Sequence, residues 1–242
     1  MQEKSAAIVL RTVRYNDNSL IVDLLTESSG RVSYIIKVSR ARNTSVHPSL
    51  FSPLALLEIE AEGKSVSRLS RITESRLLYP AHSLSSNPIK VSIALFLGEF
   101  LCYAMREECN NPSLFAYLSY SVRWLDAVSD DRVANFHLVF LMRFSRFLGL
   151  FPNLDNYNEG DCFDMLNACF SSVVPPHGQY LKPAESVSLL SLMRMNYETM
   201  HLFSFNRTQR IRCLEVLNDY YRLHIPGFPQ LRSLEVLQQI FD

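Results

Sequence analysis

The sequence predicts an α+β protein in which a small five-stranded β-barrel is followed by an all-helical domain. Short runs rich in β-branched and alternating apolar residues fill the first 80 of the 242 residues. From about residue 81 onward, apolar residues recur at helical spacing behind proline start signals. Apolar residues make up 48% and charged residues 20% of the chain, which excludes disordered, collagen-like and coiled-coil classes. We therefore expect two domains, residues 1–80 and residues 81–242.

The predicted strands follow one another with short connections. They are residues 6–10, 20–25, 32–38, 54–60 and 65–72. Gly30 closes a short polar loop that begins at Thr26, and because glycine adopts positive φ freely, this loop predicts a hairpin. Five short strands in so few residues are typical of a small closed barrel or a sandwich. The oligonucleotide-binding (OB) barrel is the commonest five-stranded solution that leaves a face free for a ligand, so we expect an OB-type barrel.

Start and stop signals mark the helical half. The predicted helices span residues 88–107, 112–128, 130–148, 183–199, 207–223 and 233–241. Asn87 and Asn111 each precede a proline, which is the pattern of an N-cap followed by proline at the first helical position. Asn206 and Gln209 have the spacing of a capping box. Prolines interrupt the helical pattern over residues 151–182, where we expect an irregular insert.

Targeting signals and cysteine usage indicate the compartment. Arg11 ends the first apolar run after five residues, which is too short for the core of a signal peptide. The longest apolar run, residues 91–105, is broken by Ser92, Gly98 and Glu99 and falls short of a membrane span. Five cysteines, an odd number, fit a reducing compartment better than a disulfide framework. We expect a cytoplasmic protein with no membrane association.

Basic residues are concentrated in the first half of a chain whose net charge is zero. Residues 1–80 carry 11 Lys and Arg against 8 Asp and Glu, a net charge of +3, which leaves −3 for the remainder. Strand alternation predicts that Arg31 and Lys37 face solvent together, opposite a core residue, Tyr34. This excess suits contact with phosphates, although a solvated basic strand without function explains it equally well. The candidate DNA-binding residues are Arg14, Arg31, Lys37, Arg40 and Arg42.

The sequence contains no known catalytic signature and no complete metal site. It has no glycine-rich phosphate loop, His-Glu-x-x-His motif, nucleophile elbow or dinucleotide fingerprint, so we expect neither an enzyme nor a small-molecule substrate or cofactor. Cys162, Cys169 and His177 fall in the insert, but a tetrahedral site needs four ligands. Asp126 and the acids at 130–131 cluster at a helix end and the next helix start, where capping explains the acids near the start.

Phenylalanines at helical spacing mark the third helix as a core helix. Phe136, Phe140 and Phe144 repeat at the interval that places side chains on one face. Arginines at the polar edge of this helix offer a second interpretation, a pocket that binds the carboxylate of a partner peptide. The candidate peptide-binding residues are Arg132, Arg143 and Arg146.

Several soft motifs occur in a fixed order along nearly the whole chain. They are Ile-Val-Leu-Arg-Thr at 8–12, Tyr15, the strand at 18–25, Thr26 with Gly30, the basic segment 37–42, Leu-Phe-Ser-Pro-Leu at 50–54, Leu-Gly-Leu-Phe-Pro-Asn-Leu at 148–154 and Arg-Ser-Leu at 232–234. In their order and spacing they resemble the RecO family of bacterial recombinational-repair proteins. The resemblance implies an N-terminal OB barrel and a C-terminal helical domain.

The resemblance also implies a function without bond-making chemistry. The family binds single- and double-stranded DNA, anneals complementary strands and, with RecR, helps load RecA onto strands coated with single-strand-binding protein (SSB). It further implies that the C-terminal tail of SSB docks on the helical domain, and it places the protein at the nucleoid. An alternative of another class is an adaptor that captures acidic peptides through its helical domain and has no direct role on DNA.

One departure from the family concerns zinc. Many relatives carry a four-cysteine zinc module after the motif at 148–154, whereas here neither residues 157–162 nor residues 175–180 contain a Cys-x-x-Cys pair. We expect hydrogen bonds and aromatic packing to hold this region, with no structural zinc.

Overall fold

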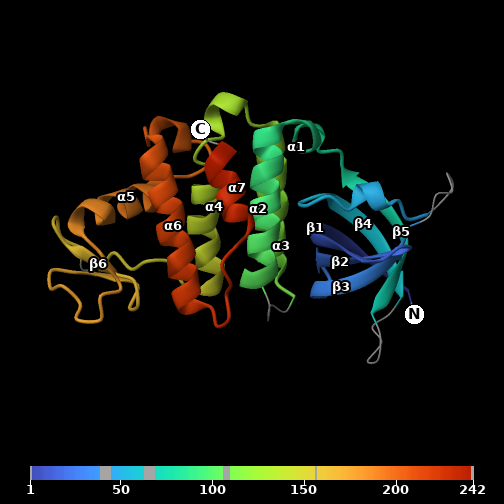
Figure 1. Ribbon diagram of the computed structural model, residues 1–242, viewed down its shortest axis with the longest axis horizontal. Coiled ribbons are helices and arrows are strands. Elements are labelled where there is room, and N and C mark those ends of the chain that lie inside the picture. Colours follow the sequence, from blue (N-terminus) through green and yellow to red (C-terminus); the bar gives the residue numbers. More distant parts are fainter. Residues whose placement is uncertain (1, 39–44, 63–68, 106–109, 156, 241–242) are drawn as a thin grey trace. The chain divides into compact units, whose positions relative to one another are not determined.

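The computed structural model describes residues 2–38, 45–62, 69–105, 110–155 and 157–240 (Figure 1). It contains two compact units. The first comprises Met1–Ala127 with Leu231–Ile240, and the second comprises Val128–Gln230. The change from strands to helices comes after Tyr79, but the compact units divide much later in the chain. The predicted domain boundary at residue 80 therefore stays a prediction.

The first unit opens with a closed barrel of five strands in the order β1-β2-β3-β5-β4. The strands are β1 (Gln2–Asn16), β2 (Ser19–Thr26), β3 (Gly30–Lys37), β4 (Leu56–Glu62) and β5 (Ser70–Tyr79). β3 and β5 pair in parallel, and the other neighbours are antiparallel. The α+β class with an OB-type barrel is confirmed.

Two strands differ from their predicted limits. β1 continues to Asn16 instead of ending at residue 10. β5 runs from Ser70 to Tyr79, which is later than the predicted 65–72, and residues 63–68 lie outside the described part of the chain. The predicted hairpin is confirmed, because Gly30 has φ 68° and the Thr26 hydroxyl donates to its carbonyl at 2.9 Å.

The barrel interior is filled by apolar side chains from all five strands and by two aromatic rings, of which Phe51 comes from the segment between β3 and β4. Its buried residues are Ala7, Val9, Val22, Leu24, Tyr34, Ile36, Phe51, Leu57, Ile59, Ala61 and Ile72. Tyr34 is 5% exposed, and burial raises its pKa to about 12. The prediction that Tyr34 belongs to the core is confirmed, and this side chain is not available to stack on a base.

Where the structure describes the first unit, four α-helices accompany the barrel. They are α1 (His82–Ser86), α2 (Pro88–Ala104), α3 (Pro112–Ala127) and α7 (Ser233–Ile240), and a 3₁₀ turn, η1 (Pro48–Leu50), lies between β3 and β4. The two predicted N-caps are confirmed, since Asn87 accepts from the Ile89 amide at 2.9 Å and Asn111 from the Leu114 amide at 3.0 Å. α7 packs on α2, where the Glu99 carboxylate accepts from the amide of Ser233 at 2.8 Å.

α2 packs against the outer side of β1. Ile8 and Leu10 alternate with the core residues of this strand, yet both are almost completely buried. The closest approach is at Gly98, where an added Cβ would lie 2.4 Å from the Leu10 carbonyl oxygen. A residue that points outward from this part of the barrel is therefore covered by a helix instead of by water.

Asp126, near the end of α3, joins three other elements. Its carboxylate accepts from the Tyr79 hydroxyl at 3.0 Å and from the amides of Ser83 and Leu84 at 2.8 and 3.1 Å. Its backbone carbonyl accepts from Lys90, a buried lysine of α2, at 2.9 Å. Burial alone would raise the pKa of Asp126, but these hydrogen bonds outweigh it and hold that pKa below its ordinary value. The sequence placed Asp126 only at a helix end and missed this role.

The described residues of the second unit form three α-helices and three 3₁₀ turns. They are α4 (Phe136–Phe144), α5 (Pro183–Arg194), α6 (Arg207–His224), η2 (Asp130–Arg132), η3 (Ser145–Leu148) and η4 (Met200–Leu202). The predicted extent of the third helix, residues 130–148, was wrong. Only Phe136–Phe144 is α-helical, and 3₁₀ turns form at both ends of the predicted range. The phenylalanines of this helix are buried as predicted, and the Asn206–Gln209 capping box is confirmed. Among the described residues, no helix is long and apolar enough to cross a membrane.

A small sheet occupies the region predicted to be irregular. β6 (Cys162–Asp164) lies between β7 (Cys169–Ser171) and β8 (Tyr180–Leu181). Strands of two or three residues are too short to show an alternating pattern, so the sequence did not reveal them.

Candidate nucleic-acid interface

The register of the barrel groups its outward side chains into four rows. Directly paired residues of neighbouring strands lie on the same face of a sheet. From α2 outward, the rows are Ile8–Leu25–Arg31, Arg11–Asp23–Ser33, Val13–Ile21–Ile35–Arg71 and Asn16–Ser19–Lys37. This face spans β1, β2 and β3, the side of an OB barrel that ordinarily carries the ligand.

Arg31 lies in the first row and is used inside the fold. Its guanidinium donates to the Cys102 carbonyl, near the C-terminal end of α2, at 2.6 Å, and lies 3.8 Å from Asp23. Only 19% of its side chain is exposed. The expectation that Arg31 faces solvent beside Lys37 was wrong. The Arg31 side chain points outward from the barrel, as strand alternation predicts, but α2 covers this part of the barrel and shields the side chain from water.

The second row is an internally neutralised network. Asp23 is 3% exposed and accepts from Arg11 at 2.8 Å. The Ser33 hydroxyl donates to the other oxygen of the same carboxylate. Burial lowers the pKa of Arg11, but the Asp23 carboxylate more than reverses this and raises it above its ordinary value. These charges hold the strands together and offer little to a ligand.

The third and fourth rows are open to solvent and carry uncompensated positive charge. Lys37 and Arg71 are exposed, and neither makes an ion pair within the described part of the chain. Arg14 is 72% exposed but belongs to neither row, because it pairs with Leu20 on the core side; its guanidinium lies 3.1 Å from Asp17, which is 96% exposed. The two remaining candidates, Arg40 and Arg42, lie outside the described residues. We name the side chains Tyr15, Lys37 and Arg71, together with the apolar strip Val13–Ile21–Ile35, the open face.

Two members of the open face were not singled out from the sequence. Tyr15 is 62% exposed, and Arg71 is the partner of Ile35 in the parallel pairing of β3 and β5. Tyr15 lies beyond residue 10, where the first predicted strand ends, so its place on a strand was not predicted. Arg71 was missed because its contact with β3 is long-range. Continued alternation through Arg11, Val13 and Tyr15 was the available signal for the first.

Two cations beside β4, Lys4 of β1 and Arg76 of β5, are neutralised. Lys4 lies 3.1 Å from Glu58, and Arg76 pairs with the same carboxylate. The hydrogen bond from Lys4 has the largest effect on Glu58 and lowers its pKa below the ordinary value. Arg76 lowers this pKa further. Lys4, Glu58 and Arg76 line a polar cavity of about 360 Å³. Glu60 and Glu74 also line this cavity. A polyanion would meet carboxylates here, so the open face is the better candidate.

The structure gives the three peptide-binding candidates different environments. Arg143 donates to the Met195 carbonyl at 2.5 and 3.0 Å, which is a structural contact. Arg146 lies over the Phe151 ring at 3.9 Å, and burial, with the charge of Arg143, lowers its pKa. Arg132 is 56% exposed. No described contact brings all three to one pocket.

An apolar pocket of about 280 Å³ lies between α5 and α6 of the second unit. Leu189, Leu192 and Val216 contribute to its lining, and Arg212 lies among the polar residues around it. Glu185 holds Arg212 at 2.7 Å, and Glu215 is 3.5 Å away. A peptide carboxylate would have to displace an existing partner to reach this arginine.

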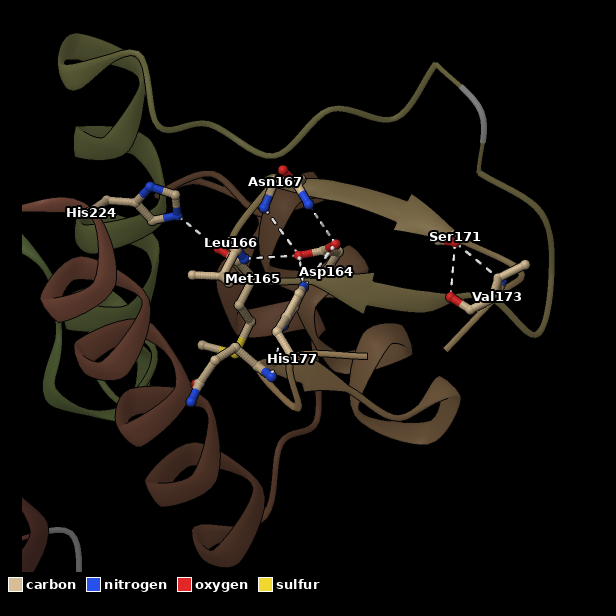
Figure 2. A network of polar contacts seen from close by, with 9 residues as sticks. Asp164, Met165, Leu166, Asn167, Ser171, Val173, His177 and His224 are labelled. Carbon is tan, nitrogen blue, oxygen red and sulfur yellow. Dashed lines mark hydrogen bonds and ion pairs between the residues drawn. The ribbon is translucent and has the colours of Figure 1, made fainter. Parts of the chain in front are cut away.

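The small sheet is held by a network centred on Asp164 (Figure 2). The Asp164 carboxylate accepts from the Leu166 amide at 2.9 Å and from the Asn167 side chain at 2.8 Å, and it lies 3.3 Å from His177 Nε2. Burial alone would raise the pKa of Asp164, but the hydrogen bonds outweigh it and lower that pKa.

Aromatic packing joins this network. The Phe163 and Phe170 rings lie 5.0 Å apart, and Tyr157 meets Phe170 edge-on at the same distance. Within the described residues, no group of three His, Cys, Asp or Glu side chains has the geometry to hold a metal ion. The expected hydrogen bonds and ring contacts are therefore present, and the absence of zinc stays a prediction.

Comparison with known proteins identifies the family. Residues 1–81 match the family described as Recombination protein O N terminal, and residues 85–235 match Recombination protein O C terminal. The chain is 55% identical to DNA repair protein RecO of Phocaeicola vulgatus over 242 residues, which cover all of both chains. It is 55% identical to the Bacteroides fragilis protein of the same name and 39% identical to that of Azobacteroides pseudotrichonymphae, again over the whole of each chain. With matches at both ends and full-length relatives, the chain belongs to the RecO family of DNA repair proteins.

Proposed function

We propose that this protein is a non-enzymatic recombination mediator that binds single- and double-stranded DNA through the open face of its barrel. The observation that carries the proposal is the exposed and uncompensated charge of Lys37 and Arg71 on the ligand side of an OB barrel. Arg40 and Arg42 come three and five residues after Lys37 in the sequence and make this segment of the chain more positive. Neutralised phosphates allow two complementary strands to approach, which is what annealing requires.

A salt titration of single-stranded DNA binding tests this proposal. Each lost phosphate contact should reduce the log–log slope by about 0.7, because the protein then displaces fewer counterions from the strand. We expect a flatter slope after Lys37→Ala, Arg40→Ala and Arg42→Ala together. The matched control is Lys4→Ala with Arg76→Ala, which removes cations already neutralised by Glu58 and should leave the slope unchanged. Equal slopes for the wild type and the triple variant would contradict the assignment.

We further propose that the protein anneals complementary strands and acts with RecR to load RecA on SSB-coated DNA in the cytoplasm, at the nucleoid. Family membership supports a repair role in general, and the basic open face suits annealing. Fluorescence-monitored annealing of complementary oligonucleotides tests the first step, and the triple variant should slow it. Pull-down with purified RecR tests the partner.

The C-terminal tail of SSB is the proposed peptide partner of the helical part. Of the three candidate arginines, Arg132 has the most available guanidinium, because Arg143 is bound to a carbonyl and Arg146 is stacked on a ring. Anisotropy with a labelled tail peptide should show weaker binding for Arg132→Ala than for Lys182→Ala, an exposed cation at the start of α5. If peptide binding survives while the whole chain has no affinity for DNA, the adaptor alternative is favoured.

A further inference from the structure

We propose that Tyr15 is a base-stacking residue and gives the open face a preference for single strands over duplexes. The inference rests on the proposed DNA-binding function and adds a residue with a stated role to it. It depends on where the β1–β2 pairing breaks, on the exposure of Tyr15 and on the charges around it.

A bulge displays Tyr15. Pairing between β1 and β2 passes from Arg14–Leu20 to Asn16–Ser19, so Tyr15 has no partner across the ladder. Bulges commonly redirect a side chain. The ring is 62% exposed and makes no hydrogen bond or ring contact within the described residues. An exposed aromatic ring at the edge of an OB ligand face is the usual platform for a base.

The strip beside Tyr15 is apolar where a nucleobase would lie. Val13 is 44% exposed, and its cross-strand neighbours Ile21 and Ile35 are half-buried. Arg71 lies at the end of the same row, beside Ile35, and Lys37 lies in the next row, so the strip has a cation at one end and another along one side. An apolar surface bordered by positive charge is complementary to a strand with unstacked bases and a phosphate backbone.

Arg14 precedes Tyr15 in β1 and adds an exposed cation at this end of the strand, although its pairing with Leu20 puts it in the register of the inward-facing row. Its partner Asp17 is 96% exposed, and ion pairs between such exposed groups contribute little, so a phosphate can displace the carboxylate. In a duplex the bases are paired and stacked, and their faces are not available to Tyr15. The cations can therefore bind the phosphates of single-stranded and double-stranded DNA alike. The Tyr15 ring can stack only on the bases of a single strand.

Binding to three probes of equal length tests the inference with the full chain. The probes are an oligothymidine strand, an abasic strand with the same number of phosphates and a duplex. Tyr15→Ala should weaken binding to oligothymidine about tenfold, the usual effect of losing one stacked base. It should leave abasic-strand binding, duplex binding and the salt slope unchanged. Tyr15→Phe should restore wild-type affinity, and Tyr120→Ala, which removes a half-exposed tyrosine from α3, is the matched control.

Two results would overturn the stacking role. One is equal oligothymidine affinity for Tyr15→Ala and wild type. The other is an equal loss on all three probes, which would mean that the ring shapes the hairpin and contacts no base. A wild-type chain that binds none of the probes overturns the proposed function itself, and this outcome is distinct because it does not depend on Tyr15.

Discussion

Arg31 donates to a carbonyl in the last turn of α2, where backbone oxygens lack partners within the helix. Arg31→Ala should therefore lower the free energy of unfolding by about 1.5–3 kcal/mol, the range for hydrogen bonds to a charged group. Urea unfolding followed by the fluorescence of Trp124, the only tryptophan and part of α3, measures this. Lys37→Ala should have the opposite profile, with unchanged stability and a flatter salt slope for DNA binding. A flatter slope for Arg31→Ala at full stability would show that the arginine contacts phosphate after all.

Asp126 should make stability depend on pH in the acid range. Its pKa is lowered in the folded state, so its stabilisation is complete above the ordinary carboxyl pKa of about 4 and is lost as the pH falls through the lowered value. Asp126→Asn should cost about 1–3 kcal/mol at neutral pH, because charge-assisted hydrogen bonds weaken. The difference from wild type should shrink between about pH 5 and pH 2 in urea unfolding. Glu27→Gln, a change at an exposed acid of the same unit, should show no such convergence.

At the level of elements, Gly98 sets how closely α2 approaches β1. A methyl group here would meet the Leu10 carbonyl oxygen at 2.4 Å, and a backbone atom cannot move aside as a flexible side chain can. Overpacking of this kind costs about 1–3 kcal/mol, which exceeds the gain of about 1 kcal/mol in helix propensity. Gly98→Ala should therefore lower the midpoint of thermal unfolding. An increased midpoint would show that α2 can shift outward at no cost.

The small sheet should be independent of metal. Asp164→Ala removes the acceptor shared by Leu166, Asn167 and His177, so the turn that follows β6 loses the hydrogen bonds that fix it. Hydrogen exchange at the β6 and β7 amides should accelerate in this variant, and Asp155→Ala, at an exposed position, should not change it. A strong zinc chelator should leave the exchange of the wild type unaltered. Faster exchange with chelator alone would indicate a bound metal.

Elements with a local chemical signature could be predicted from the sequence, and long-range contacts could not. Asn87, Asn111 and Asn206 cap helices through bonds to amides two or three residues away, so the spacing itself reveals them. Strand alternation placed Tyr34 in the core for the same reason. Arg31 bonds to a carbonyl 71 residues away, and no local pattern shows that a helix covers its row. The sequence therefore predicted the exposure of Lys37 correctly and that of Arg31 wrongly. It gave no indication that Arg71 lies beside β3.

Over the whole molecule, the neutral net charge is an average over surfaces that differ in what they offer a polyanion. Several cations of the first 80 residues are already bound by carboxylates, including Lys4, Arg11 and Arg76. The excess of +3 in this half is therefore less informative than Lys37 and Arg71, which are exposed and make no ion pair among the residues that the structure describes. The position of the charges, rather than their sum, selects the open face.

The C-terminal helix belongs to the N-terminal unit, which leads to a prediction for the whole chain. Leu237 of α7 is completely buried, and Glu99 of α2 caps this helix through the amides of Arg232 and Ser233. Truncation after Gln230 should therefore destabilise the barrel and its helices, although the deleted segment is remote from them in sequence. Trp124 fluorescence should report a lower unfolding midpoint, and hydrogen exchange should accelerate in β1 and α2 more than in α5 and α6. Leu237→Ala should reproduce part of the effect, about 2–5 kcal/mol, whereas Val236→Ala, at a half-exposed neighbour, should have little effect. Faster exchange confined to α5 and α6 would contradict this assignment of α7.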